Sequence, residues 1–306
     1  MTESLPKTDQ RKRPPYRSLE DRVISWLNNS RYALTEPLLL RLARLLHARK
    51  YRDKNESPLI SVYIPTYNRA ELLATRSIPS VLNQTYSNLE LLVLGDHCTD
   101  STEEVVRSFN DSRLRFFNIP SRKYRYPETA LNHWLAGPVV AANTALSMLN
   151  GKWIARIDDD DKWTPDHIES LLRFAQQEDF EFVSSYCLFE RFGKREKGPV
   201  PGALDSYYTN REPPPGAYNP RIGGTQTWLY RSYLKFFKYN INCWRKNWNR
   251  VNDIDISIRM FNAGVQMGFL DKVTCEILPR PGEETVGFDA YISDPEEKEE
   301  HFKFRD

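Results

Sequence analysis

The chain has 306 residues, of which 40% are hydrophobic and 27% are charged. This composition excludes a disordered chain and predicts one large globular domain with appendages. The formal net charge of +2 favours no particular partner, but residues 1–57 carry 13 Lys or Arg against 7 Asp or Glu, whereas the remainder carries 30 against 34. Because the main body is mildly acidic, nucleic acid is not an expected partner.

The four cysteines are far apart in the sequence, at Cys98, Cys187, Cys243 and Cys275. Their spacing contains no Cys-x-x-Cys and no Cys/His cluster, which argues against a structural zinc site and against a disulfide framework. No apolar run approaches the ~20 residues that span a bilayer, and the first residues lack the apolar segment of a signal peptide. We therefore expect a cytoplasmic protein, with peripheral contact at the inner face of the membrane as an alternative.

The basic N-terminal extension is predicted to contain two helices. The stretch 18–30 opens on a capping pattern led by Ser18. The stretch 35–52 opens on Thr35 and Pro37, which suit a cap and a first turn. Its leucine stripe consists of Leu38, Leu39, Leu42, Leu45 and Leu46. This stripe either packs onto the main domain or a partner chain, or lies on an anionic membrane surface; we expect packing, the commoner fate of such stripes.

Beyond this extension, apolar strands alternate with helices. Short apolar runs predict strands at 59–65, 89–95, 113–119, 152–157, 180–189, 225–230, 266–270 and 273–279. Helical patterns occupy 71–83, 101–109, 137–149, 164–177 and 251–264. The alternation predicts an α/β fold in which a mostly parallel central sheet is flanked by helices.

A Pro/Gly-rich stretch at 193–220 interrupts the second half of the chain. Loops of this length inside a domain are usually lids or binding loops. The last residues are polar and predict a C-terminal tail. The expected organisation is a basic extension at 1–57, a main domain at 58–290 and a polar tail at 291–306.

Four consecutive aspartates, Asp158 to Asp161, directly follow the apolar strand at 152–157. Ligands of open α/β sheets bind at the carboxyl ends of strands. Residues two apart on an extended chain point the same way, so Asp158 and Asp160 converge and need a cation between them. Hard oxygen ligands without Cys or His favour Mg²⁺ or Mn²⁺ over zinc, and such an ion would neutralise a diphosphate leaving group. The alternative is a solvated acidic turn that caps the next helix.

Two stretches stand out by the order of their motifs: PLISVYIPTYNRAELLATRSIPSVLNQTYSNLELLVLGDHCTD and GKWIARIDDDDKWTPDHIESLL. In this order they resemble a family 2 glycosyltransferase. The resemblance runs from about Leu59 to Leu172 and continues more loosely to LPRPGEETVGFDAY, covering about two thirds of the chain. It implies the GT-A fold, with a Rossmann-like nucleotide-binding half and an acceptor-binding half. It also implies inverting, metal-dependent transfer from a nucleotide-sugar donor to a polysaccharide, lipid-linked or small-molecule acceptor.

The resemblance also implies roles for single residues. Near the nucleotide base would lie Pro65, Thr66 and Tyr67. Asp96 would accept a hydrogen bond from the base ring, which favours a UDP- or dTDP-sugar donor. The family usually has two aspartates before Gly-Ser at this point, whereas this chain has GDHC. Asp158 and Asp160 would hold the metal of the family's Asp-x-Asp motif, and Asp158 would also contact the nucleotide.

The catalytic base implied by the resemblance is Asp253. It aligns with the aspartate of a Glu-Asp pair that opens a helix in the family, and Asn252 stands in place of the glutamate. Asp255 is a second acid, but two positions along a helix differ by about 200°, so only one of the two acids faces the cleft. We expect Asp253 to face it. The alternative is a first-turn aspartate that complements the helix dipole.

Two other functions stay open at this point. A nucleotidyltransferase on a related sheet typically needs a glycine-rich loop with Lys or Arg after the first strand, and PTYNRAE offers no such glycines. A non-catalytic nucleotide-sugar-binding protein is compatible with the altered GDHC and ND motifs. Hydrolysis of nucleotide sugars in the presence of Mn²⁺ separates an enzyme from this binding protein.

Overall fold

The computed structural model describes residues 18–199, 221–247, 249–292 and 302–304. The strands of its single sheet are β1 (Ile60–Thr66), β2 (Leu89–Gly95), β3 (Leu114–Asn118), β4 (Trp153–Arg156), β5 (Asp161–Trp163), β6 (Phe182–Arg191), β7 (Lys194–Gly198), β8 (Leu229–Arg231) and β9 (Met267–Ile277). The helices are α1 (Leu19–His47), α2 (Ala70–Leu72), α3 (Ile78–Leu82), α4 (Thr102–Ser108), α5 (Ala130–Ala136), α6 (Val139–Met148), α7 (His167–Gln177), α9 (Asn252–Ala263) and α10 (Phe288–Ile292).

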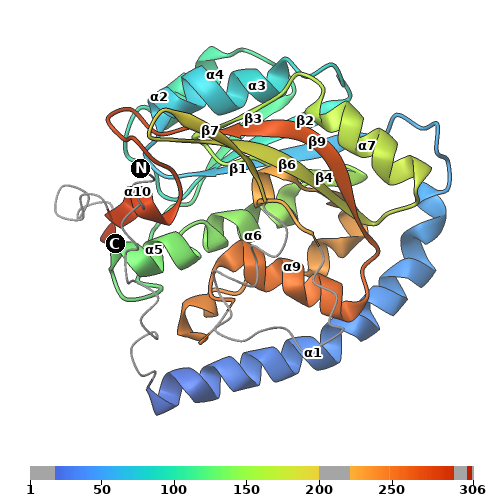
Figure 1. The fold of residues 1–306 in the computed structure, drawn as a ribbon, viewed down its shortest axis with the longest axis horizontal. Coiled ribbons are helices and arrows are strands. Elements are labelled where there is room, and N and C mark those ends of the chain that lie inside the picture. The colour runs from blue at the N-terminus through green and yellow to red at the C-terminus, as the bar shows by residue number, and fades with distance from the viewer. Residues whose placement is uncertain (1–17, 200–220, 248, 293–301, 305–306) are drawn as a thin grey trace, which may run out of the picture.

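The sheet has the strand order β3-β2-β1-β4-β8-β6-β9-β5, with β7 paired to β6. Strands β1 to β4 are parallel to one another, β8 runs antiparallel to both β4 and β6, and β6 and β9 are again parallel. Figure 1 shows α2, α3 and α4 on one side of this sheet and α5, α6 and α9 on the other. Strands covered on both faces are continuous apolar runs, and the predicted α/β architecture is confirmed.

One continuous helix, α1, replaces the two helices predicted for the N-terminal extension. Ser18 caps it as expected, because its hydroxyl oxygen accepts the N–H of Asp21 at 3.0 Å. Thr35 does not cap a second helix, since its hydroxyl donates to the carbonyl oxygen of Arg31 at 2.8 Å. Pro37 lies inside the helix. A proline removes one backbone hydrogen bond, and contacts with the rest of the protein can offset that loss.

The second half of the sheet differs from prediction in three places. The two short strands expected at 266–270 and 273–279 form one strand, β9, whose pairing with β6 shifts register around Tyr186. The start of the Pro/Gly-rich stretch forms β7, and the rest of the predicted loop, 200–220, lies outside the described residues. The strand predicted at 225–230 divides into a 3₁₀ turn (Thr225–Thr227) and β8.

His167, the first residue of α7, is fully buried. Its ring stacks on Trp163 with the ring centres 3.9 Å apart, and its Nδ1 lies 2.8 Å from the hydroxyl oxygen of Thr274. Burial lowers the pKa of His167 from 6.5 to about 3. The imidazole is therefore neutral in the folded protein over the ordinary pH range.

We expect the free energy of unfolding to fall as the pH drops from 6.5 towards about 3, because the unfolded chain binds a proton at His167 that the folded protein excludes. The slope from this group is at most ~1.4 kcal/mol per pH unit. His167→Gln should flatten the slope in urea denaturation measured across this range. As a control, His47→Gln on α1 should keep the wild-type slope. Equal slopes for wild type and His167→Gln would contradict the assignment.

Candidate active site

The carboxyl ends of three parallel strands meet at the centre of the sheet, because β1 lies between β2 and β4. Thr66 ends β1, Asp96 directly follows β2, and Asp158 lies two residues beyond β4. The N–H of Asp96 donates to the carbonyl oxygen of Thr66 at 2.8 Å, and the Thr66 hydroxyl donates to Asp159 at 2.7 Å. The predicted nucleotide-binding and metal-binding residues are therefore neighbours, at the edge where such sheets bind ligands.

Asp96 is bound by two arginines of the segment between β3 and α5. Arg125 donates to both of its carboxylate oxygens, at 2.8 and 2.9 Å, and Nε of Arg122 donates to Oδ2 at 3.1 Å. Asp96 and Arg122 are almost completely buried. Oδ1 accepts only one of these hydrogen bonds, so it can accept a second hydrogen bond from another donor. In the sequence these arginines are visible only as the two in SRKYR, residues 121–125. No local pattern indicates that this segment contacts the end of β2.

Tyr67 lies against Arg122, with 3.8 Å between the guanidinium carbon and the centre of the ring. The ring of Phe304 is 5.1 Å from the same guanidinium carbon, and the N–H of Phe304 donates to Glu128 at 2.7 Å. Part of the predicted polar tail is therefore packed against Arg122 and Glu128, in the segment between β3 and α5. Pro65 is buried within β1, and Tyr67 is partly exposed.

The four aspartates divide into two kinds. Asp158 is 35% exposed, and its Oδ1 accepts hydrogen bonds from Nε and Nη2 of Arg156 at 3.0 and 2.7 Å. Asp160 is 28% exposed, with Arg69 at 3.7 Å from its Oδ2. The chain forms a turn at residues 159 and 160 instead of the extended run expected there. Asp159 accepts the Thr66 hydroxyl, and Asp161 is buried in β5. Asp158, Asp159 and Asp160 are all partly exposed, whereas Asp161 is buried.

Burial and the neighbouring carboxylates raise the pKa values of two of the four aspartates, Asp159 and Asp161. Burial raises the pKa of Asp159 to about 7, against the charge of Arg69 and with help from Asp160. Burial and the neighbouring carboxylates also raise the pKa of Asp161 well above its ordinary value. A divalent cation would relieve this repulsion. Within the described ranges no three His, Cys, Asp or Glu side chains are placed to hold a metal. A cation here would rely on Asp158 and Asp160 and complete its coordination with substrate oxygens.

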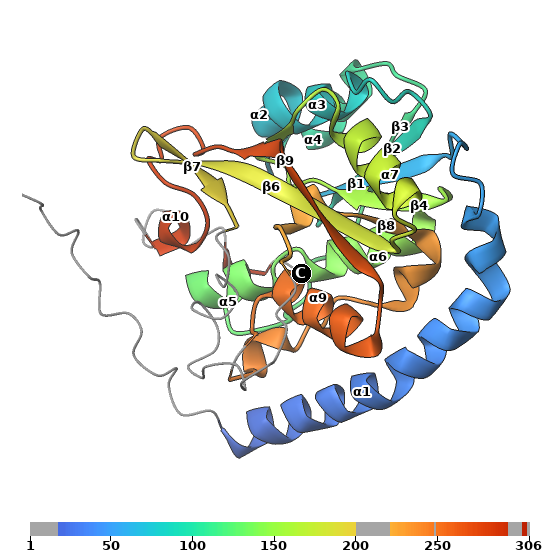
Figure 2. The same ribbon diagram turned by 45° about the vertical axis from the view of Figure 1, so that its right-hand side comes forward.

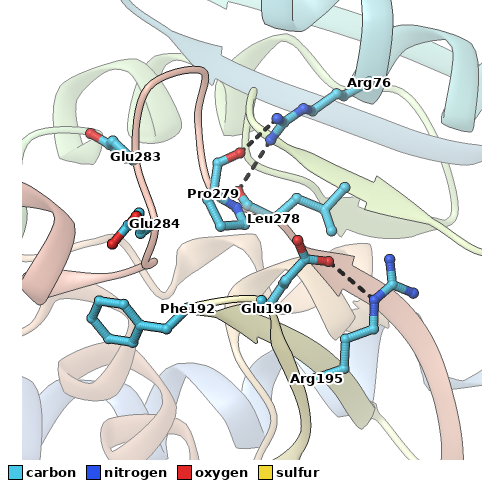
Figure 3. A pocket seen from close by; sticks show the side chains of 9 residues that line it. Arg76, Glu190, Phe192, Arg195, Leu278, Pro279, Glu283 and Glu284 are labelled. Carbon is cyan, nitrogen blue, oxygen red and sulfur yellow. Dashed lines mark hydrogen bonds and ion pairs between the residues drawn. The ribbon is translucent and has the colours of Figure 1, made fainter.

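Arg76 connects the aspartates to a neighbouring cavity. It lies on a π-helical turn, η2 (Leu73–Ser77), of a kind often found at functional sites. Its guanidinium donates to the carbonyl oxygens of Asp160, Leu278 and Pro279, at 3.0, 3.1 and 2.6 Å. Arg76 lines a cavity of about 620 Å³, and Figure 3 shows its guanidinium directed towards Leu278 and Pro279. The other charged residues of its wall are Glu190, Arg195, Glu283 and Glu284. Asp158 and Asp160 do not line this cavity.

The two acids of α9 have different surroundings. Asp255 is fully buried, and its carboxylate accepts hydrogen bonds from Lys246 at 2.7 Å and Arg259 at 2.9 Å. Asp253 is partly buried and lies within electrostatic reach of the aspartate motif. Burial raises the pKa of Asp253, Arg156 opposes the rise, and the charge of Asp158 adds to it. Asp253 is therefore the acid of this helix that is coupled to the predicted metal-binding residues.

We expect strong coupling between Asp96 and Arg125, because both side chains are at least nine-tenths buried. In a double-mutant cycle of Asp96→Asn and Arg125→Met, the coupling free energy from chemical denaturation should be about 2 kcal/mol. The exposed pair of Glu103 and Arg107 on α4 is the matched control. Its cycle, with Glu103→Gln and Arg107→Met, should give at most ~0.5 kcal/mol. Equal couplings in the two cycles would refute a structural role for the buried pair.

Comparison with known proteins assigns the family. Residues 61–247 match the family model described as glycosyl transferase family 2. WcaA of Escherichia coli strain K12, named as a colanic acid biosynthesis glycosyl transferase, is 32% identical over 213 residues, which are 67% of this chain and 66% of WcaA. The Escherichia coli UDP-Glc:alpha-D-GlcNAc-diphosphoundecaprenol beta-1,3-glucosyltransferase WfgD is 35% identical over 125 residues, 41% of this chain and 44% of WfgD. The chain thus spans less than two thirds of either relative.

Among solved structures, the mannosyltransferase PcManGT from Pyrobaculum calidifontis, in complex with GDP-Man and Mn²⁺, aligns with a TM-score of 0.53 at 18% identity. The alignment covers 82% of this chain and 69% of PcManGT. At this identity the likeness concerns the fold, and it confirms the predicted GT-A class. Since the family match covers more than half of its residues, the chain belongs to glycosyl transferase family 2.

Proposed function

We propose that the protein transfers a sugar from a nucleotide-diphosphate sugar to an acceptor hydroxyl by metal-assisted, inverting displacement. The observation that carries this proposal is the meeting of Thr66, Asp96 and Asp158 at the ends of adjacent parallel strands, with Asp253 in electrostatic reach of Asp158. Family membership supports the use of a nucleotide sugar.

In this proposal Asp158 and Asp160 hold Mn²⁺ or Mg²⁺ through their accessible oxygens. Arg156 binds only Oδ1 of Asp158, so the carboxylate is oriented and its other oxygen stays available. Hard carboxylate oxygens suit these ions. When bound, the ion neutralises charge that develops on the departing diphosphate. The Mn²⁺ in the PcManGT complex supports this choice of metal.

The nucleotide would occupy the ends of β1 and β2, beside Pro65, Thr66, Tyr67 and Asp96. A free lone pair on Asp96 suits the imide N–H of uracil or thymine, and the name of WfgD gives UDP-Glc as its donor. A UDP- or dTDP-sugar is therefore the favoured donor. Because Arg122 covers one face of the Tyr67 ring, a base that stacks on that face would have to displace the guanidinium.

The general base in this mechanism is Asp253. Its partial burial and raised pKa favour uptake of the proton from the attacking acceptor hydroxyl. Asp255 is less suited, because Lys246 and Arg259 bind its two oxygens. Attack from the side opposite the leaving diphosphate inverts the anomeric centre, which is the stereochemistry that a single base supports.

The acceptor is proposed to be a polysaccharide, a lipid-linked sugar or a small sugar; the name of WfgD specifies a diphosphoundecaprenol-linked acceptor. A cytoplasmic location is supported by the four cysteines, all of which are free, as in a reducing compartment. No helix in the described ranges combines the length and the apolar character needed to cross a bilayer.

We expect Asp158→Asn and Asp160→Asn each to lower Mn²⁺-dependent release of nucleoside diphosphate by roughly a hundredfold, since each removes a metal ligand. The assay uses a panel of UDP-, dTDP- and GDP-sugars, with donor affinity measured by calorimetry. Asp271→Asn is the matched control, because Asp271 is exposed on β9. Wild-type turnover and donor affinity in both site variants would overturn the metal assignment.

Asp253→Asn should lower kcat by about 10²–10⁴-fold while donor affinity stays the same, because a general base acts on the acceptor rather than on the nucleotide. Transfer rates and donor calorimetry on the same protein samples separate the two quantities. Retained turnover would exclude Asp253 as the base. Donor binding by the wild type without nucleoside diphosphate release from any sugar of the panel would instead indicate a binding protein.

A further inference from the structure

The inner side of α1 is held to the domain largely by ion pairs. Arg44 donates to both carboxylate oxygens of Glu181, at 2.7 and 2.6 Å. Glu36 pairs with Arg259 of α9. The buried side chains of the helix are Glu36, Leu40 and Ala43. Ion pairs and the two core residues Leu40 and Ala43 therefore hold this side of α1 against the domain.

The leucine stripe lies on the outer side of α1. Of the two kinds of packing predicted for it, packing onto the main domain is wrong, and packing onto a partner chain stays a prediction. Leu38, Leu39, Leu42, Leu45 and Leu46 are between 41% and 82% exposed, and Leu27 and Leu34 extend the same face towards the N-terminus. Figures 1 and 2 both show α1 along the margin of the molecule. A long apolar face left in water is unfavourable and marks an interaction site.

Basic side chains border this leucine face. Between Arg22 and Lys50 the sequence contains a single acid, Glu36, which is buried against Arg259. The exposed cations close to the leucines that pair with no acid in the described part of the chain are Arg41, Arg49 and Lys50. Leucines with flanking cations are typical of helices that lie in a membrane interface.

We infer that the outer face of α1, from Leu27 to Lys50, docks on an anionic lipid membrane surface. The leucines would enter the boundary of the acyl chains, and the arginine side chains would reach the phosphate headgroups. A second copy of the chain is a poorer occupant. A twofold pairing of two such helices centred on the leucines brings arginines against arginines, and no exposed acid between Arg22 and Lys50 offsets the repulsion.

Membrane docking is independent of the transfer chemistry. For a lipid-linked acceptor it would hold the enzyme where that acceptor lies. Because α1 contacts the domain through its inner side, the outer face can bind lipid without breaking the contacts of Arg44 and Glu36.

Flotation of the full chain with vesicles tests the inference. Binding to phosphatidylcholine vesicles that contain phosphatidylglycerol should be at least about tenfold stronger than to phosphatidylcholine alone, and should weaken with added salt. The triple variant Leu38→Ser, Leu42→Ser, Leu45→Ser should lower the partition coefficient by at least about tenfold. The double variant Arg41→Glu, Arg49→Glu should abolish the preference for phosphatidylglycerol.

The controls carry equivalent changes elsewhere on the surface. Arg107→Glu with Arg173→Glu makes the same charge change on α4 and α7, and Phe117→Ser removes an exposed ring from β3. These variants should bind vesicles as the wild type does. All variants should release nucleoside diphosphate normally without lipid, which separates a failure of docking from a failure of the proposed activity.

Two results would overturn the inference. One is binding that is absent, or equal in the wild type and the triple serine variant. The other is a dimer in light scattering without lipid that becomes a monomer in the triple serine variant, which would assign the leucine face to self-association.

Discussion

Charge compensation at the ends of the central parallel strands is the constraint on which the site depends. The order β2-β1-β4 brings carboxylates from two strand ends into one region of low dielectric, where unpaired charges are costly. Three of these carboxylates each form an ion pair with an arginine: Asp96 with Arg125, Asp158 with Arg156 and Asp160 with Arg69. Asp159 and Asp161 remain under-compensated, as their raised pKa values show. The site therefore has residual affinity for positive charge.

The sequence predicted what depends on local patterns. Strands β1, β2 and β4 were identifiable as apolar runs because both faces of the sheet are covered, and the aspartates were identifiable because they directly follow such a run. The two arginines that bind Asp96 were not identified as its partners. Arg122 lies 26 residues from Asp96, and Arg76 lies 203 residues from Pro279. Partners this far apart leave no periodicity, so only the folded topology brings them together.

For the N-terminal helix, the sequence predicted helical structure correctly but not its orientation. Its leucine spacing correctly predicts a helix with one apolar side, but a helix with one apolar side can turn that side either way. Its orientation is fixed by Arg44 and Glu36, whose partners Glu181 and Arg259 belong to distant parts of the chain. Ion pairs that bury long side chains can decide which face points inwards, because an unpaired buried charge costs more than an exposed leucine. Periodicity alone cannot weigh these two terms.

Arg156 interacts with two acids of the proposed reaction, Asp158 and Asp253. Its guanidinium is buried at the end of β4, where it orients Asp158 through two hydrogen bonds and also lowers the pKa of Asp253. Since water cannot screen a buried cation effectively, the same charge acts on both acids. Burial raises the pKa of Asp253, and the positive charge of Arg156 limits that rise. In the proposed mechanism, the residue that orients the metal-binding carboxylate of Asp158 would thereby also moderate the basicity of Asp253, the proposed general base.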